Sequence, residues 1–149
     1  MRKHILVPTD GSQNANLALK EAIFFAKQLD EKIILLHVQM SMSTIHTRRF
    51  FNEEEIHAYE NQLSDEALAP ALDLLKETNV SYEVKKRTGN PKEEILKEAQ
   101  EGQIRTIVVG AKGTGAIIGS LLGSVAHGLV QHAPCPVMVV PNRALHTDA

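Results

Sequence analysis

The stretch HILVPTDGS, residues 4–12, determines the first unit of the predicted fold. Its apolar part, residues 4–8, is short and unbroken, which is typical of a strand buried on both faces of a sheet. Residues 9–12 then supply a tight turn and a candidate helix cap. From Ala18 onwards, alanines recur at intervals of four, which indicates one face of a helix. These residues therefore predict a strand, a turn and a helix, in that order.

The same alternation continues to residue 140. We expect further strands at residues 32–38, 80–84, 104–109 and 137–140, and further helices at residues 53–77, 91–101 and 124–132. Strands that alternate with helices favour a parallel sheet joined by right-handed crossovers. The predicted fold class is therefore α/β, a single doubly wound domain over residues 1–142 with a short polar tail at residues 143–149. Its five-stranded parallel sheet has the order 3-2-1-4-5 and carries helices on both faces.

Four local features of the sequence lead to further structural predictions. Residues 39–52 show no clear period and predict a loop. Pro70 predicts a kink or break near Ala69, because proline removes a helical hydrogen bond. Gly102 is expected to end a helix in the left-handed conformation. The basic run at residues 85–87 is interpreted as a solvated strand end.

Composition excludes several classes of function. The 149-residue chain has a net charge of −2, four Phe, two Tyr and no Trp. Neither a phosphate backbone nor an anionic membrane is attracted by that charge, and few rings are present to stack on bases. No apolar stretch approaches the length of a membrane span. A single cysteine, Cys135, suits a reducing cytoplasm. We therefore expect a cytoplasmic protein that binds neither nucleic acid nor membrane.

Two loops are predicted at the carboxyl edge of the sheet, where ligands of doubly wound folds bind. One loop follows the first strand, and the other, GAKGTGAIIGSLLGSV, covers residues 110–125. Glycines and the start of the last helix present backbone N–H groups to an anion, and Lys112 adds a charge. Asp10 could accept ribose hydroxyls, hold a divalent cation, or simply cap its own turn. Val38 could pair with an adenine edge or belong to the core.

Motifs of other chemistries are missing from the sequence. No Walker A loop is present, and Ile118 stands where a dinucleotide fingerprint needs its third glycine. The histidines form no H-E-x-x-H motif, and the E-x-x-H spacing of Glu54 and His57 occurs once, although di-metal bundles need it twice. No G-x-S-x-G elbow or hydrolytic triad is supported. We therefore assign no catalytic residue.

The glycine loop fits the pattern G-x2-G-x9-G-[ST] at Gly110, Gly113, Gly123 and Ser124. With ILVPTDGS at residues 5–12, LLHV at 35–38, G-x-P at 89–91 and HAPCPVMVV at 132–140, the chain resembles the universal stress protein family over nearly its whole length. The resemblance implies a domain that binds ATP with Mg²⁺ or Mn²⁺ and that forms a homodimer through its last strand. It also implies these contacts: adenosine with Pro8, Thr9, Asp10 and Val38, ribose with Gly110, and phosphates with Lys112, Gly113, Gly123, Ser124 and Val125.

The leading hypothesis is an ATP-binding stress protein that acts as a nucleotide-responsive dimeric module without strong catalytic machinery. One alternative is a slow ATPase or phosphotransferase, in which Lys112 and a metal ion at Asp10 stabilise the transferring phosphate. The other alternative is a nucleotide-independent dimeric adaptor, with partner surfaces at residues 39–52 and at the acidic start of the helix that follows.

Overall fold

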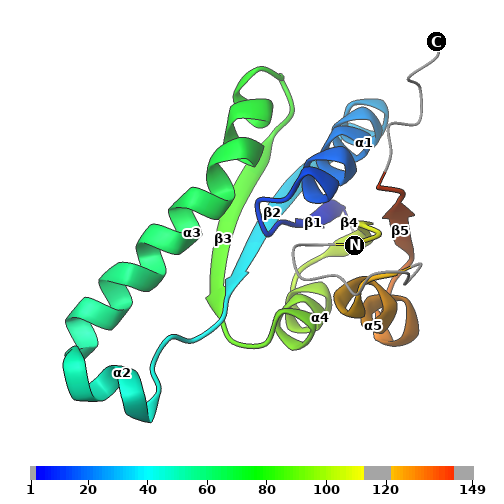
Figure 1. The fold of residues 1–149 in the computed structure, drawn as a ribbon. Helices are drawn as coiled ribbons and strands as arrows, with labels where there is room; N and C mark the ends of the chain where they lie inside the picture. Colours follow the sequence, from blue (N-terminus) through cyan, green and yellow to red (C-terminus); the bar gives the residue numbers. More distant parts are fainter. Residues whose placement is uncertain (1–2, 113–121, 143–149) are drawn as a thin grey trace.

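The computed structural model describes residues 3–112 and 122–142. Their strands form one parallel sheet with the order β3-β2-β1-β4-β5 (Figure 1). The strands are β1 (His4–Pro8), β2 (Lys32–Gln39), β3 (Tyr82–Thr88), β4 (Ile104–Gly110) and β5 (Val137–Val140). The predicted fold class and strand order are confirmed, and β1 and β4 lie side by side at the point where the order reverses.

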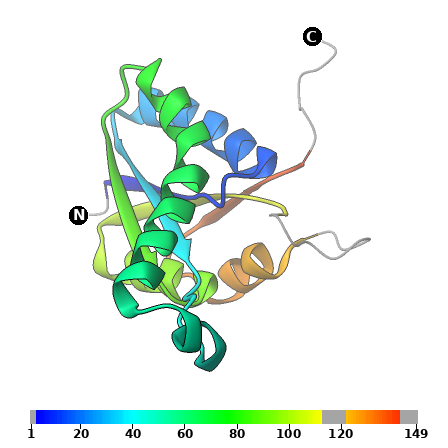
Figure 2. The ribbon, with the colours of Figure 1, turned by 60° about the vertical axis from the view of Figure 1, so that its left-hand side comes forward.

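Helices cover both faces of the sheet. They are α1 (Gln13–Leu29), α2 (Ile45–Phe50), α3 (Glu53–Lys76), α4 (Pro91–Glu101) and α5 (Ser124–His132). One face packs against α1 and α3 and the other against α4 and α5, and α2 lies beyond the end of the sheet (Figures 1 and 2). Both faces of the central strands are therefore buried, as their unbroken apolar sequences predict.

Alternate side chains of each strand enter different halves of the core. In β1, Ile5 and Val7 join the cluster under α1 and α3, whereas Leu6 joins the cluster under α4 and α5. All three are at most 2% exposed. The alternation follows from the period of two in an extended chain. The small residues of α1, such as Ala18 and Ala22, allow that helix to lie close to the sheet.

Three local expectations are wrong. Residues 39–52 are more than a loop, because Thr44 and Thr47 form a reciprocal capping box that starts α2. Helix α3 runs unbroken through Pro70, so the predicted break is wrong, and the alternative of a kink stays a prediction. Gly102 is extended with φ −82°, and its N–H still closes α4 on the carbonyl of Glu98.

The third strand also differs from its prediction. It covers Tyr82–Thr88, later than the expected residues 80–84, and it includes the basic run. Lys85 and Arg87 belong to the strand because their side chains pair with Glu98 of α4, at 2.7 Å and 2.8 Å. The positive residues therefore attach an edge strand to a helix, and the prediction of a solvated strand end is wrong.

Candidate functional site

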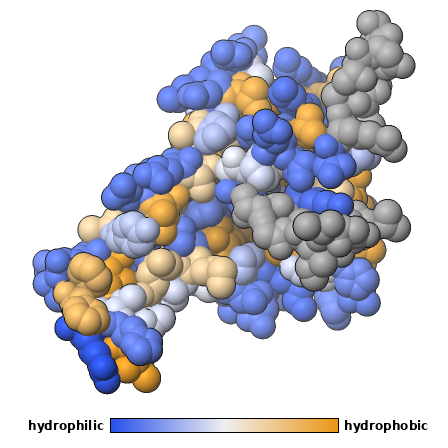
Figure 3. All heavy atoms as spheres, in the orientation of Figure 1, coloured by the Kyte–Doolittle hydropathy of each residue, from blue (hydrophilic) through white to orange (hydrophobic). Residues whose placement is uncertain are grey.

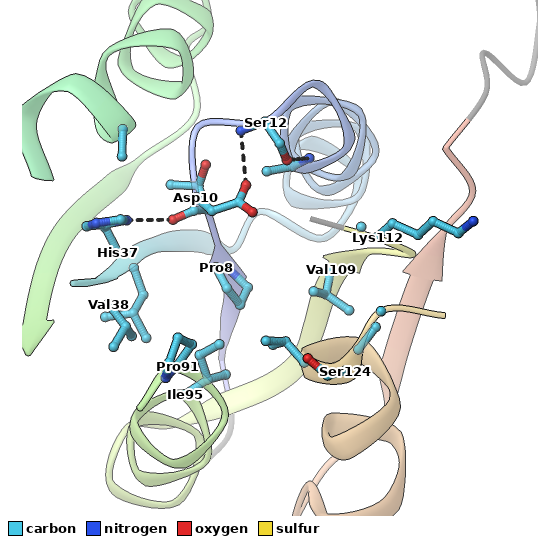
Figure 4. A pocket seen from close by; sticks show the side chains of 18 of the residues that line it. Pro8, Asp10, Ser12, His37, Val38, Pro91, Ile95, Val109, Lys112 and Ser124 are labelled. Atoms are coloured by element: carbon cyan, nitrogen blue, oxygen red, sulfur yellow. Dashed lines mark hydrogen bonds between the residues drawn. The ribbon is translucent and has the colours of Figure 1, made fainter. Parts of the chain in front are cut away.

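The turn after β1 is fixed by its own polar side chains. The Thr9 hydroxyl accepts a hydrogen bond from the N–H of Gly11 at 3.1 Å, and the Asp10 carboxylate accepts one from the N–H of Ser12 at 3.0 Å. Ser12 caps α1 by accepting from the N–H of Ala15. The turn thereby holds the Asp10 carboxylate at the carboxyl edge of the sheet (Figure 4).

Two glycines allow close backbone approach around this turn. Gly11 has φ +84°, and a Cβ there would lie 3.1 Å from the backbone of Ala67 in α3. At Gly110, a Cβ would lie 2.8 Å from the carbonyl oxygen of Asn14 in α1. Any side chain at Gly110 would push the end of β4 away from α1. Both loops of the site therefore depend on glycine for their position.

Helix α5 begins at the same edge. The N–H of Gly123 donates to the carbonyl of Ala111 at 2.7 Å, which brings both ends of the glycine-rich loop together. Gly123 supplies no side-chain cap, and the first backbone bond into the helix runs from the N–H of His127 to Gly123. The N–H groups of the first turn, which begins with Ser124, are thus available to an anion, and the helix dipole favours negative charge there.

The two loops enclose a cavity of about 950 Å³. Nine of the ten predicted site residues line it: Pro8, Thr9, Asp10, Val38, Gly110, Lys112, Gly123, Ser124 and Val125. The tenth, Gly113, lies outside the described residues. Pro8 and Val109 form the floor between Val38 on one side and Ser124 on the other (Figure 4). The structure thus brings together residues that are a hundred positions apart, and their binding roles stay predictions.

The two charged residues of the predicted set point differently. Asp10 lies over the cavity beside the start of α1, whereas the side chain of Lys112 extends towards β5 and away from Asp10 (Figure 4). In this conformation the described ends of the second loop line the cavity, whereas the Lys112 ammonium group extends away from it.

One wall of the cavity has no counterpart in the sequence prediction. It is formed by Met40 and Met42 after β2 and by Leu63 of α3. The buried carboxylate of Glu60 fixes this wall, because it accepts a hydrogen bond from the N–H of Met42 at 2.7 Å. His57 also bonds to Glu60, at 3.1 Å. Met40 and Met42 lie in the aperiodic segment 39–52, so no sequence signal indicated this wall.

His37 is a second residue that the sequence left without a role. It is 6% exposed, and its Nδ1 lies 2.8 Å from the carbonyl oxygen of Thr9. Its Nε2 lies 3.2 Å from the side-chain oxygen of Gln39. The imidazole thus joins β2 to the turn after β1 and lines the cavity with both nitrogens engaged. His37 belongs to the motif LLHV at residues 35–38, but no local pattern indicates its contact with the turn after β1.

Metal-ligating side chains do not cluster in the described ranges: no group of three or more His, Cys, Asp or Glu there could hold an ion by itself. Among residues 3–112 and 122–142, no helix combines the length and hydrophobicity that crossing a membrane requires.

The fold and cavity define an open α/β domain with a ligand-sized cavity at the switch point of its sheet. The chain belongs to the universal stress protein family, whose family model matches residues 1–141. It is 31% identical over 147 residues to universal stress protein YxiE of Bacillus subtilis, covering 94% of this chain and 99% of that protein. It is 33% identical over 158 residues to universal stress protein MJ0577 of Methanocaldococcus jannaschii, covering 96% and 97%.

Solved structures agree with this assignment. The structure of MJ0577 matches with a TM-score of 0.77 at 32% identity, covering 96% of this chain and 98% of that chain. A universal stress protein family protein from Arabidopsis thaliana, solved with AMP bound, matches with a TM-score of 0.68 at 25% identity, covering 95% and 93%. The chain therefore shares both the family and the fold of these proteins.

Proposed function

We propose that this chain binds ATP in the cavity and acts as a nucleotide-responsive dimeric module of the stress response. The observation that carries the proposal is the convergence of the β1 turn and the amino end of α5 on one cavity of about 950 Å³. Small-molecule cavities typically measure about 300–1,000 Å³. The AMP bound to the related Arabidopsis protein supports a nucleotide as the class of ligand.

The two ends of the cavity suit the two ends of a nucleotide. Val38, Met40 and Ile95 give the first end aliphatic walls, and the carbonyl and N–H groups after β2 can pair with the edge of a base. At the other end, the first turn of α5 presents N–H groups and a positive dipole to phosphates. No Phe, Tyr or Trp is among the described lining residues, so shape and backbone hydrogen bonds would select the base.

The side chains present fit a metal ion that the phosphates carry. Asp10 is the only carboxylate among the described residues that line the cavity, and Ser124 adds a hydroxyl. Mg²⁺ usually keeps several waters and binds through one or two carboxylates together with phosphates, so it needs no cage of side chains. Asp10 would hold Mg²⁺ or Mn²⁺ on this proposal, and the ion would offset the phosphate charge.

Binding, without rapid turnover, is the proposed activity. A phosphotransferase needs a group that orients the nucleophile and cations that stabilise the transferring phosphate. Among the titratable side chains of the described lining, both nitrogens of His37 lie within hydrogen-bond distance of other residues, and Lys112 extends away. Asp10 is assigned to the metal ion on this proposal, which leaves His127 of α5 as the remaining lining group that could exchange a proton. The arrangement favours a site that holds nucleotide and reports its presence.

Dimerisation through β5 and a cytoplasmic location belong to the same proposal. β5 is an edge strand with an apolar sequence, VMVV, and it pairs with β4 along one side. Such an edge invites another strand, and a second copy of β5 would cover it. The single cysteine, Cys135, suits a reducing compartment.

Thermal denaturation with and without Mg-ATP tests the site. At ligand concentrations near 100 times Kd, binding stabilises the wild-type protein by about 2.7 kcal/mol. Ser124→Glu should abolish this shift, because it places a negative charge where phosphate binds. The unliganded protein should remain stable, since acidic residues suit the first turn of a helix.

Gln131→Glu is the matched control, because it adds the same charge at the opposite end of α5. It should keep the full shift. A wild-type protein that shows no shift with Mg-ATP, or a Ser124→Glu variant that shifts normally, would refute the proposed site.

A further inference from the structure

Apolar side chains are exposed at the tip formed by α2 and the start of α3. This tip, residues 45–59, carries Ile45, Phe50, Phe51 and Tyr59, whose exposed fractions are 74%, 78%, 51% and 48%. Phe50 and Ile45 have the highest exposed fractions of all large apolar side chains in the described residues. Figure 3 shows apolar surface at this tip beside charged groups. Clustered exposed apolar groups of this kind mark interaction sites.

The tip is a built structure, held by its own hydrogen bonds. Capping boxes at Thr44 and Asn52 start α2 and α3. The Thr47 hydroxyl also donates to the carbonyl of Met42, at 2.8 Å. No residue of α2 is buried, so its apolar side chains take no part in the core. Several polar contacts therefore hold these apolar side chains in a position exposed to solvent.

Charges of opposite sign flank the two phenylalanines. Arg48 and Arg49 precede them at the end of α2, and three glutamates at residues 53–55 follow at the start of α3. Within the part of the chain that the structure describes, neither arginine joins an ion pair, and Glu54 joins none. The basic and acidic residues of the tip thus stay unpaired with each other, although only Phe50, Phe51 and Asn52 separate them in sequence.

A surface with this order of charges is complementary to itself. When a second copy is turned by a twofold axis, its glutamates face the arginines of the first copy and the phenylalanines meet in the centre. An anionic membrane would attract the arginines but repel the three glutamates, which argues against a lipid surface. We propose that the tip is a self-association surface, which pairs two copies of this chain through Phe50 and Phe51 with Arg48 and Arg49 against Glu53 and Glu54.

This surface is separate from β5. The tip lies beyond the β2–β3 side of the sheet, whereas β5 forms the opposite edge (Figure 1). One chain can therefore use both surfaces at once, and dimers formed through β5 would associate further into tetramers or longer assemblies. The tip pairs chains whether or not nucleotide is bound and whether or not β5 dimerises.

Sedimentation velocity over a range of protein concentration tests the proposal. We expect the wild-type chain to form larger species as concentration rises and Phe50→Glu to lose this step, with an unchanged circular dichroism spectrum. Phe24→Glu on α1 is the matched control, since Phe24 is also an exposed aromatic residue (55%). The same comparison in a Val139→Pro background, which blocks the β5 edge, separates the two associations.

A charge exchange tests the predicted pairing. The variant Arg48→Glu with Arg49→Glu has an all-acidic tip, and the variant Glu53→Arg with Glu54→Arg has an all-basic tip. Each alone should fail to associate through the tip, and an equimolar mixture should recover the association. The proposal is overturned if Phe50→Glu sediments like wild type at every concentration, or if the mixture does not associate. It is also overturned if the wild-type tip binds phosphatidylserine vesicles while failing to self-associate.

Discussion

The two edge strands of the sheet differ in the charge of their side chains. Strand β3 carries Lys85, Lys86 and Arg87, and these side chains pair with acidic residues of α3 and α4. Strand β5 carries four apolar residues, VMVV, and no charged residue lies along it. Charged residues on an edge strand discourage pairing with another chain, whereas an apolar edge invites it. The comparison indicates that one edge is closed by ion pairs, whereas the other, open edge carries only apolar side chains.

The closed edge depends on one buried carboxylate. The Glu98 side chain is 3% exposed and lies 2.7 Å from the Lys85 ammonium and 2.8 Å from the Arg87 guanidinium. Arg87 also reaches Glu94 and Glu101 of α4. Burial alone would raise the pKa of Glu98, but hydrogen bonds from Lys85 and Arg87 outweigh it and hold that pKa below its ordinary value.

Proline substitutions at the two edges should have opposite outcomes, and this is the largest expected difference. The carbonyls of Pro136 and Val140 accept hydrogen bonds from β4, so the N–H of Val139 points to the open edge. Val139→Pro removes that donor and should convert a dimer formed through β5 into monomer, as measured by light scattering after gel filtration.

The matched control is Val84→Pro on β3. The carbonyl of Ser81 accepts from the N–H of Ile33 in β2, so alternation turns the N–H of Val84 to the outer side. This variant should keep the wild-type mass. If Val84→Pro dissociates the dimer and Val139→Pro does not, the assignment of open and closed edges is reversed.

Removing the buried carboxylate should have the next largest effect. Glu98→Ala leaves Lys85 and Arg87 without their common partner and should lower the free energy of unfolding by about 3 kcal/mol, as expected when one member of a buried ion pair is lost. Urea denaturation measures this change.

Glu101→Ala is the control for that experiment. It removes another carboxylate that bonds to Arg87, at 2.9 Å, but the Glu101 side chain is 66% exposed. Its loss should cost about 0.5 kcal/mol or less. Equal losses for the two variants would show that burial does not distinguish these ion pairs.

The same contrast explains what the sequence could predict. Unbroken apolar runs such as residues 4–8 and 104–109 predict buried parallel strands, because their burial requires no knowledge of partners. The extent of β3 could not be predicted, because Lys85 and Arg87 enter the strand through contacts with Glu98, thirteen and eleven residues away. Local patterns therefore revealed the centre of the sheet better than its β3 edge.

Local sequence patterns likewise predict only some parts of the candidate site. Glycine and helix-cap signals are local, so the sequence indicated the β1 turn and the start of α5. The wall of Met40 and Met42 depends on Glu60, eighteen residues beyond Met42 in the chain. His37 takes its role from a contact with Thr9 across two strands. Side chains that act through distant partners leave no periodic signal.

Acidification should reduce the difference in unfolding free energy between the wild-type protein and Glu98→Ala. The folded-state pKa of Glu98 lies below the ordinary value of 4.5, so ionised Glu98 stabilises the fold above the unfolded-state pKa. That stabilisation is lost as pH falls through the folded-state pKa. The Glu98→Ala variant lacks this carboxyl, so its unfolding free energy should fall less between pH 6 and pH 3. Urea titrations at each pH measure the unfolding free energies of the two proteins. A difference between them that stays constant with pH would show that Glu98 acts by packing alone.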